Sequence, residues 1–366
     1  MFTFFHLSDI HIGKRLFDYD MSEDHRYVLS QVVNEAREKH PDCVIIAGDV
    51  YDRTTPSEES VSILNDFLTS LHDLEIPVCI ISGNHDPEER LSFLRDIVRK
   101  QNIFFSRPYD GIVEKVRIKN ADVYLLPYIR PADVKKHFPD EEISDINSAM
   151  GKVLSAITPD RERINIMVAH QYVSGAVLSG GEEMNIGGET PVSPRVFDGF
   201  DYTALGHIHS AQRAGSGRIR YSGSVLKCSV KERGERSFLH VKVDDDRTIT
   251  CEERVLRPLH DIVIKRGFFD DIIHESSDDY VYVKLLDREL IPDAGKRLGD
   301  RFERFLSLEY VSDGENSDDV SLFTGEEEHT PMEYFEELFR SVLGKELSSE
   351  QRACAEELIS GIWSQV

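Results

Sequence analysis

The chain has 366 residues, of which 40% are hydrophobic and 30% are charged, and its formal net charge is −24 at pH 7. Domains usually hold about 100–200 residues, so this length predicts about two to three domains. The acidic charge argues against a protein that binds nucleic acid through an extended basic surface. Bound cations can still supply the contact with phosphate locally.

No stretch of about 18 apolar residues occurs, so we expect no membrane span and no membrane partner. The first six residues, MFTFFH, lack the basic start of a signal peptide. The five cysteines are scattered and form no CxxC pair, which predicts buried free thiols in a reducing cytoplasm.

Strands and helices alternate through the first hundred residues. Short apolar runs at 3–7, 44–47 and 77–82 read as strands, and the run before Gly48 is apolar enough to be buried on both faces of a sheet. Helices are expected at 21–39, with Ser22 as its N-cap, at 58–74 and at about 90–100. The second helix carries an apolar stripe at Val61, Leu64, Phe67, Leu68 and Leu71. This alternation predicts an α/β layered fold with parallel strands.

A second sheet region is expected further along the chain. Residues 112–118 and 123–126 read as a hairpin, and Asp145 is expected to cap a helix that reaches Ile157. Strands follow at 164–169, 202–205, 220–221, 237–243 and 248–255. The Gly-rich stretch 174–194 has no periodicity and is expected to be a loop over the site.

The character of the chain changes at about Pro258. Residues 262–311 alternate as a small β-α-β-α-β domain, 312–328 read as an acidic linker, and two amphipathic helices are expected at 331–343 and 348–363. These two helices lack a core of their own, so they dock either on this chain or on a partner. The predicted domains are 1–257, 258–315 and 316–366.

Polar side chains follow five of the predicted strands: Asp9 and His11, Asp49, Asn84 and His85, His170, and His207 and His209. Open α/β sheets place their chemistry at the carboxyl ends of the strands. One such histidine could be an ordinary core residue, but five convergent strand ends are hard to explain in that way. We therefore expect these side chains to form one site.

Mixed Asp, His and Asn ligands suit Mn²⁺, Fe or Zn²⁺ rather than a thiolate zinc site or an all-oxygen calcium site. The ligands are too many for one ion, and two ions that share Asp49 as a bridge fit the count. Two ions about 3.5–4 Å apart can activate a water and neutralise both oxygens of an in-line phosphoryl displacement. Hydrolysis of a phosphate ester is the expected reaction.

The order of motifs resembles the calcineurin-like metallophosphoesterases over about residues 1–225: Asp-X-His, Gly-Asp-X-X-Asp, Gly-Asn-His-Asp, a lone His and Gly-His-X-His. This resemblance implies a layered β-sandwich flanked by helices, with a small α/β capping domain and C-terminal helices. Within the superfamily the chain resembles the SbcD-type nucleases, the bacterial branch of the double-strand-break repair nucleases. The supporting blocks are SDIHIG, GNHD, GHIHSAQ and YSGS. Ser222 stands where we would expect Pro, which leaves the local turn open.

The resemblance also implies residue roles. One metal would be held by Asp9, His11, Asp49 and His209, and the second by Asp49, Asn84, His170 and His207. His85 would be a catalytic residue that faces the scissile phosphate. Asp86 is predicted in the same catalytic group and would orient His85. Asp52 would be a supporting carboxylate. Asp86 and Asp52 could also be ordinary turn residues. The implied metals are two Mn²⁺, with Fe, Mg²⁺ or Zn²⁺ as alternatives at one site.

The implied activity is 3′→5′ exonuclease on DNA ends and endonuclease on single strands or hairpins, in DNA repair, recombination and replication. The helices at about 57–74 and 90–100 would form a homodimer. The C-terminal helices would bind the base of the coiled coil of the SbcC ATPase, in an end-processing complex associated with the nucleoid.

Two other classes remain open. A phosphatase or cyclic-nucleotide phosphodiesterase would use the same metals, but no Gly follows Arg53 and Asp86 stands where the protein phosphatases carry Glu. A scaffold that has lost catalysis would not need the complete ligand set and His85.

Overall fold

The computed structural model describes residues 1–180, Glu182, residues 190–311 and isolated positions between 332 and 355. The chain divides into two compact units. The first contains Met1–Ile264, Ser277–Tyr282 and Glu303–Leu306, and the second contains Lys265–Ser276, Val283–Phe302 and Ser307–Val366. Every residue expected to act in the site belongs to the first unit.

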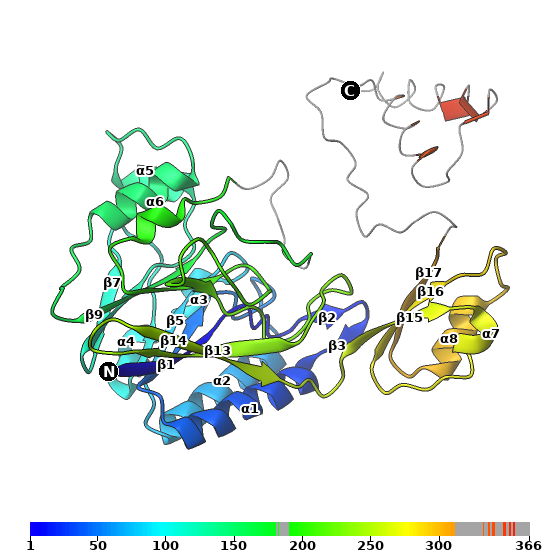
Figure 1. Cartoon of the computed structure of the whole chain (residues 1–366), viewed down its shortest axis with the longest axis horizontal. Helices are drawn as coiled ribbons and strands as arrows, with labels where there is room; N and C mark the ends of the chain where they lie inside the picture. Colours follow the sequence, from blue (N-terminus) through cyan, green and yellow to red (C-terminus); the bar gives the residue numbers. More distant parts are fainter. Residues whose placement is uncertain are drawn as a thin grey trace. The chain divides into compact units, whose positions relative to one another are not determined.

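Two six-stranded sheets form the centre of the first unit (Figure 1). The first sheet has the order β14 (Ile249–Leu256), β13 (Arg236–Val243), β1 (Phe2–Leu7), β4 (Cys43–Ala47), β5 (Val78–Ile81) and β6 (Ile103–Phe105). Strands β1, β4, β5 and β6 are parallel, whereas β13 and β14 are antiparallel additions at one side. Strands β1, β4 and β5 confirm the parallel strands predicted for the first hundred residues, whereas β6 was not predicted.

The second sheet has the order β11 (Gln212–Arg213), β12 (Ile219–Tyr221), β10 (Tyr202–Gly206), β9 (Ile164–His170), β8 (Ala121–Leu125) and β7 (Glu114–Ile118). Strands β8, β9, β10 and β12 are parallel. β7 and β8 form the predicted hairpin, with Ile118 opposite Ala121. A further two-stranded sheet pairs β2 (Arg15–Leu16) with β3 (Tyr19–Asp20).

Side chains of the central strands alternate between the two faces of their sheets, and three separate hydrophobic cores result. Ile45 of β4 packs in the core shared with the second sheet, beside Val123, Ile166 and Ala204. Its neighbour Ile46 points to the opposite face and packs against the helices. Successive side chains of a strand point to opposite faces, so a strand buried on both must be apolar throughout. The layers are therefore helix, sheet, sheet, helix, and the predicted layered α/β sandwich is confirmed.

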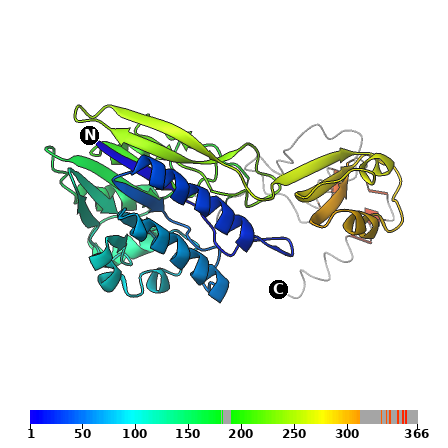
Figure 2. The same ribbon diagram turned by 90° about the horizontal axis from the view of Figure 1, so that it is seen from below.

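Helices α1 (Ser22–Lys39) and α2 (Glu58–Asp73) lie side by side on the outer face of the first sheet (Figure 2). Ser57 caps α2 by accepting a hydrogen bond from the backbone N–H of Ser60. The prediction that Ser22 caps α1 is wrong: Ser22 is the first helical residue, and the Asp20 carboxylate accepts its N–H. In the predicted apolar stripe of α2, Val61 is 49% exposed, whereas Ile63, which was not predicted to belong to the stripe, is buried.

The single helix expected at 90–100 is also wrong. The segment forms α3 (Glu88–Leu91), α4 (Arg95–Val98) and the 3₁₀ turn η1 (Arg99–Gln101). Leu94 has φ +63°, a left-handed conformation that breaks a right-handed helix at that residue. Helical periodicity in the sequence did not reveal this break.

The outer face of the second sheet is covered by α5 (Pro131–His137) and α6 (Ile146–Ser155) (Figure 1). Asp145 caps α6 by accepting the N–H of Ser148, as predicted. In the segment 174–194, which was expected as a loop over the site, Val192 forms a bridge with Val173 just before the segment, and the chain then enters the 3₁₀ turn η2 (Pro194–Phe197). Residues 181 and 183–189 lie outside the described part.

The small domain expected after Pro258 contains β15 (Ile262–Gly267), α7 (Phe269–Ile272), β16 (Tyr280–Leu285), α8 (Ala294–Arg301) and β17 (Phe305–Tyr310). Its strands form one sheet in the order β15-β16-β17, which matches the predicted alternation. The predicted linker 312–328 lies outside the described residues, as do most positions of the two predicted C-terminal helices. The predicted domain boundaries remain predictions.

Among the described residues, no helix combines the length and apolar character needed to cross a membrane. The five cysteines are free thiols: Cys43, Cys79 and Cys228 are buried, Cys251 is half-buried and Cys354 is exposed.

Candidate active site

The carboxyl ends of five parallel strands meet at one place in the first unit. Asp9 and His11 follow β1, Asp49 follows β4, and Asn84 and His85 follow β5. His170 is the last residue of β9, and His207 and His209 follow β10. Nitrogen or oxygen atoms of Asp9, Asp49 and His170 lie within 4.8 Å of one another, and so do those of His11, Asp52 and His85. The expected convergence of these strand ends is thus present in the fold.

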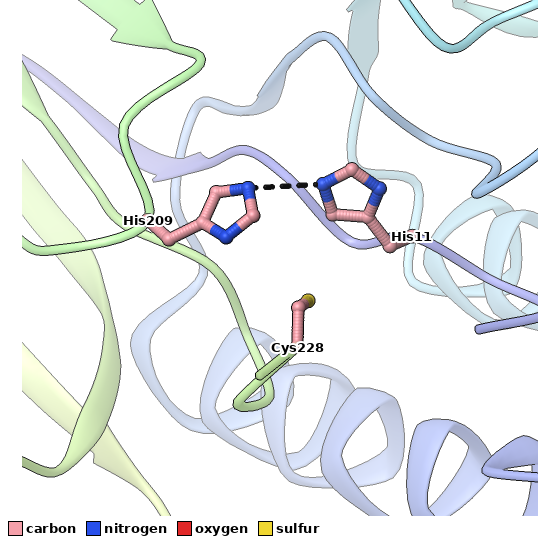
Figure 3. Close-up of side chains that lie close together, drawn as sticks. All are labelled: His11, His209 and Cys228. Atoms are coloured by element: carbon pink, nitrogen blue, oxygen red, sulfur yellow. Dashed lines mark hydrogen bonds between the residues drawn. The ribbon is translucent and has the colours of Figure 1, made fainter. Parts of the chain in front are cut away.

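The first group of ligands contains two imidazoles that face each other. His11 Nε2 lies 3.2 Å from His209 Nε2 (Figure 3). His209 Nδ1 lies 2.8 Å from the Glu232 carboxylate and must carry a proton to donate to it. In the neutral ring Nε2 then holds a lone pair, so a proton or a cation must lie between the two rings. Two nitrogens bound at about 2.0–2.1 Å to one tetrahedral ion are about 3.3 Å apart, so this pair fits a metal.

The environment of His11 also fits a metal ion at this position. His11 is 2% exposed, and its Nδ1 has no hydrogen-bond partner among the described residues, although Asp52 Oδ1 lies 3.8 Å away. Burial is the main influence that holds the pKa of His11 well below its usual value, so the ring is neutral and can act as a ligand. Lys14 pairs with Asp52 at 2.9 Å and neutralises that carboxylate.

The second group is built around His170. Its Nδ1 lies 2.8 Å from the carbonyl oxygen of Ala47 and donates to it, so Nε2 faces the site. Nε2 lies 3.0 Å from Asn84 Oδ1 and 3.3 Å from Asp49 Oδ2. Asn84 Oδ1 is also 3.1 Å from His207 Nδ1. One amide oxygen, one carboxylate oxygen and two ring nitrogens therefore converge, a donor set typical of Mn²⁺, Fe or Zn²⁺.

Asp49 lies between the two groups. Its Oδ2 is 3.3 Å from His170 Nε2 in the second group and 3.8 Å from His11 Nε2 in the first. Burial alone would raise the pKa of Asp49, but His170 and His11 hold it far below its usual range. The same pairing outweighs the effect of burial on His170 and raises its pKa to about 9, so a cation bound at this position would have to displace the proton from Nε2. Asp49 is thus an anionic carboxylate with one oxygen near both groups, and its predicted role as a ligand shared by two cations stays a prediction.

His85 reaches the site from the turn after β5. Its backbone N–H donates to Asp49 Oδ1 at 2.9 Å, and its Nδ1 lies 3.2 Å from the carbonyl oxygen of Asp52. Its Nε2 is 4.0 Å from Asp49 Oδ2, so this nitrogen is turned toward the site. The side chain is 13% exposed, more than those of His11 or His170. A ring that is both near the metal ligands and open to solvent can contact a substrate.

Asp86 is buried and accepts three backbone hydrogen bonds, from Val50 at 3.0 Å, Tyr51 at 2.8 Å and Gly83 at 2.9 Å. Its carboxylate thus ties the turn that carries Asn84 and His85 to the end of β4. This is a structural role, and a direct effect of Asp86 on the His85 ring stays a prediction.

The backbone is strained at the ligands themselves. Four of them have positive φ: +50° at Asp9, +52° at His11, +49° at Asp49 and +101° at His207. Such conformations cost roughly 1–3 kcal/mol each and persist where the surroundings enforce them, often at functional sites. The glycines beside them allow close approach, because a Cβ on Gly206 would lie 2.0 Å from the carbonyl oxygen of Ala47.

Two functional residues were missed in the sequence. Glu232 is 2% exposed and accepts hydrogen bonds from His209 Nδ1 and, at 2.6 Å, from Arg236 Nη2. Arg236 Nη1 also donates to the backbone carbonyl of His209 at 2.6 Å. Burial would lower the pKa of His209, but Glu232 outweighs it and raises this pKa. Carboxylates of this kind fix the tautomer and the direction of a metal-binding imidazole. No motif marks them, because Glu232 and Arg236 stand in a stretch of five residues, ERGER, that reads as exposed charge.

The serine at position 222 also has a structural explanation. Its Oγ lies 2.8 Å from Ser8 Oγ, and Ser8 in turn donates to the carboxylate of Asp9. Proline could not supply this hydroxyl. The departure from the expected motif therefore adds a polar contact behind a metal ligand.

Replacement of Glu232 by Ala should weaken metal binding at the first group by about 10–100-fold, because His209 loses the partner that orients it. Isothermal titration of the metal-free protein with Mn²⁺ would measure this. Glu235→Ala, which removes an exposed carboxylate three residues away, is the control and should bind as the wild type does. Equal affinities for all three proteins would contradict the role given to Glu232.

Comparison with known proteins supports the same chemistry. Residues 2–211 match the calcineurin-like phosphoesterase family. The chain also resembles the structure of a dimetal phosphatase from Danio rerio, with 13% identity, coverage of 69% of this chain and 96% of that chain, and a TM-score of 0.44. The family match spans more than half of the 366 residues. The chain therefore belongs to the calcineurin-like phosphoesterase family.

Proposed function

We propose that this chain is a two-metal DNA nuclease of the SbcD type, acting on DNA ends and on single strands or hairpins. Membership of the family already indicates a metal-dependent phosphoester hydrolase with two metal ions. The observation that carries the proposal is the complete ligand set with His85 beside it, in a chain that also contains the GHIHSAQ and YSGS blocks. The family match ends at residue 211. Residues 212–366 would then bind a larger substrate and the partners.

When bound, the two metal ions supply an activated water and neutralise charge on the phosphate oxygens. The protein contributes the positions of the groups around them. Asp49 supplies a shared anionic oxygen, and the Nδ1 contacts with Glu232 and Ala47 direct His209 and His170 into the site. His85 Nδ1 must carry a proton to donate to the Asp52 carbonyl, so Nε2 can donate a hydrogen bond or a proton to a phosphate oxygen when the ring is the imidazolium ion.

A pocket of about 380 Å³ lies next to the second group of ligands, lined by Gln171 and Tyr128 among others, and we propose that it takes part of a nucleic-acid strand. Tyr128 lies on its wall, with its ring 6.2 Å from that of His170, and the Arg130 guanidinium lies 6.0 Å from the Tyr128 ring. Bases stack on tyrosine rings and on arginine planes, which makes such a wall suitable for a strand next to the cleaved phosphate. The metals rather than a basic surface would carry the phosphate contact, which is compatible with the net charge of −24.

The test compares wild type with His85→Ala on a 3′-labelled hairpin and on linear duplex DNA, each with Mn²⁺. Wild type should cleave both, and the variant should lose about 10²–10⁴-fold in rate while both metals stay bound, since the loss of a proton donor costs about this much. Metal content is measured in every sample. His137→Ala, an exposed histidine at the end of α5 and outside the proposed dimer surface, is the control and should cleave normally.

A wild type that leaves DNA intact but hydrolyses a small phosphodiester would move the chain to the phosphatase or cyclic-nucleotide phosphodiesterase class. Absence of bound metal would favour the scaffold. Either result would contradict the proposal that this chain is a DNA nuclease.

We also propose a homodimer through α2 and the segment 88–101. Large apolar side chains are exposed there: Phe93 is 72% exposed, Ile97 61%, Leu94 50% and Val61 49%. Phe93→Glu combined with Ile97→Glu should therefore convert a dimer to a monomer in sedimentation velocity. Leu290→Glu, at a site 81% exposed in the second unit, should leave the dimer intact. A monomeric wild type would refute this proposal.

The C-terminal helices predicted at 331–343 and 348–363 are proposed to bind the coiled-coil base of an SbcC-type ATPase. Deletion of residues 331–366 should abolish co-purification with that coiled coil and leave hydrolysis of a small phosphodiester unchanged. Unaltered co-purification of the shortened chain would place the binding surface elsewhere.

A further inference from the structure

A thiol lies beside the first group of metal ligands. Cys228 Sγ and one ring nitrogen each of His11 and His209 are all within 4.8 Å of one another. Figure 3 shows the Cys228 side chain directed toward the two imidazole rings. All three side chains are buried, at 8%, 2% and 4% exposure. Nothing in the ligand set implied by the family resemblance includes this cysteine.

The thiol is held in place by the same carboxylate that orients His209. The backbone N–H of Cys228 donates to Glu232 Oε2 at 3.1 Å, while Glu232 Oε1 accepts from His209 Nδ1 at 2.8 Å. Arg236 donates both to Glu232 Oε2 and to the carbonyl oxygen of His209. Cys228 and His209 are therefore parts of one buried network, and the thiol has a defined position relative to the ring.

The existing contact of the sulfur is weak. Cys228 Sγ lies 3.7 Å from the carbonyl oxygen of Leu226, and a thiol is a poor hydrogen-bond donor. A metal ion between His11 and His209 would offer the sulfur a much stronger partner. Two imidazoles and a thiolate form a donor set that favours Zn²⁺ and softer ions, whereas Mn²⁺ and Mg²⁺ prefer oxygen ligands.

We propose that Cys228, together with His11 and His209, forms a site for a borderline or soft divalent cation, represented by Zn²⁺ or Cd²⁺. The first metal position then has two modes of binding. A hard cation uses imidazoles and carboxylates, and a softer one adds the Cys228 sulfur, whose proton passes to solvent. The proposal concerns the metal position alone and holds whether or not the substrate is DNA.

Two properties follow from this arrangement. Zn²⁺ and Cd²⁺ compete with Mn²⁺ more strongly than two imidazoles alone would allow. A sulfur ligand also occupies a coordination position that catalytic sites keep open for water. The side chain at residue 228 thus determines which divalent cation the first metal position prefers.

The experiment titrates metal-free, full-length protein with Cd²⁺ and follows the sulfur-to-cadmium charge-transfer absorption in the ultraviolet. Wild type should develop the band with one equivalent of Cd²⁺. Cys228→Ser should lose the band and bind Cd²⁺ roughly tenfold or more weakly, while its Mn²⁺ affinity stays within about twofold of wild type. Cys251→Ser, which removes a half-buried thiol on β14, is the matched control and should keep the band.

A band that survives in Cys228→Ser, or that disappears in Cys251→Ser, overturns the proposal. A second measurement needs no variant: zinc X-ray absorption of the wild-type protein with one equivalent of Zn²⁺. One sulfur at about 2.3 Å with nitrogens at about 2.0–2.1 Å supports the thiolate site. A shell of nitrogen and oxygen alone refutes it, even if the serine variant does not fold.

Discussion

A buried cluster of imidazoles and carboxylates, whose nitrogen and oxygen atoms lie within hydrogen-bonding distance of one another, is the constraint on which this structure depends. The 3.2 Å between His11 Nε2 and His209 Nε2, and the 3.0 Å between His170 Nε2 and Asn84 Oδ1, are too short for uncharged acceptors with nothing between them. Buried polar atoms without partners cost free energy, so these contacts need protons or cations. The carboxylates of Asp9 and Asp49, nearly excluded from solvent, supply the matching negative charge. A proton can fill this place, as the raised pKa of His170 indicates, and a bound cation would replace the proton and also balance the charge of the carboxylates.

The surrounding fold makes such an arrangement possible. Two sheets with parallel strands bring five strand ends to one edge, and each end contributes one or two ligands. Left-handed backbone at Asp9, His11 and Asp49 turns the chain sharply after the strands. Gly48, with φ +86°, and Gly206 let neighbouring backbones come close enough for His170 to reach the Ala47 carbonyl. The apolar cores on both faces of each sheet hold these turns in position.

A comparison of histidines shows what distinguishes a ligand from a core residue. His6 is fully buried like His170, yet both of its ring nitrogens have partners, Tyr202 and the carbonyl of Leu205, and burial lowers its pKa to about 3. His170 has a carbonyl at one nitrogen only, and its other nitrogen faces anionic and amide oxygens. The two residues differ in their partners, which come from distant parts of the chain. Burial by itself would not separate them.

The sequence alone determined most of the strands and helices, the layered α/β class, and which residues stand at the ends of the strands, but not β6, α5 or the hairpin of β2 and β3. These properties depend on local patterns, since periodicity, turn residues and short motifs act over a few positions. The tertiary structure alone decided that Glu232 and Arg236 support His209, that Cys228 lies beside it, and that Ser8 and Ser222 stand behind Asp9. It also decided where the segment 88–101 breaks. These contacts join residues far apart in the chain or depend on one backbone angle, and no local pattern encodes either.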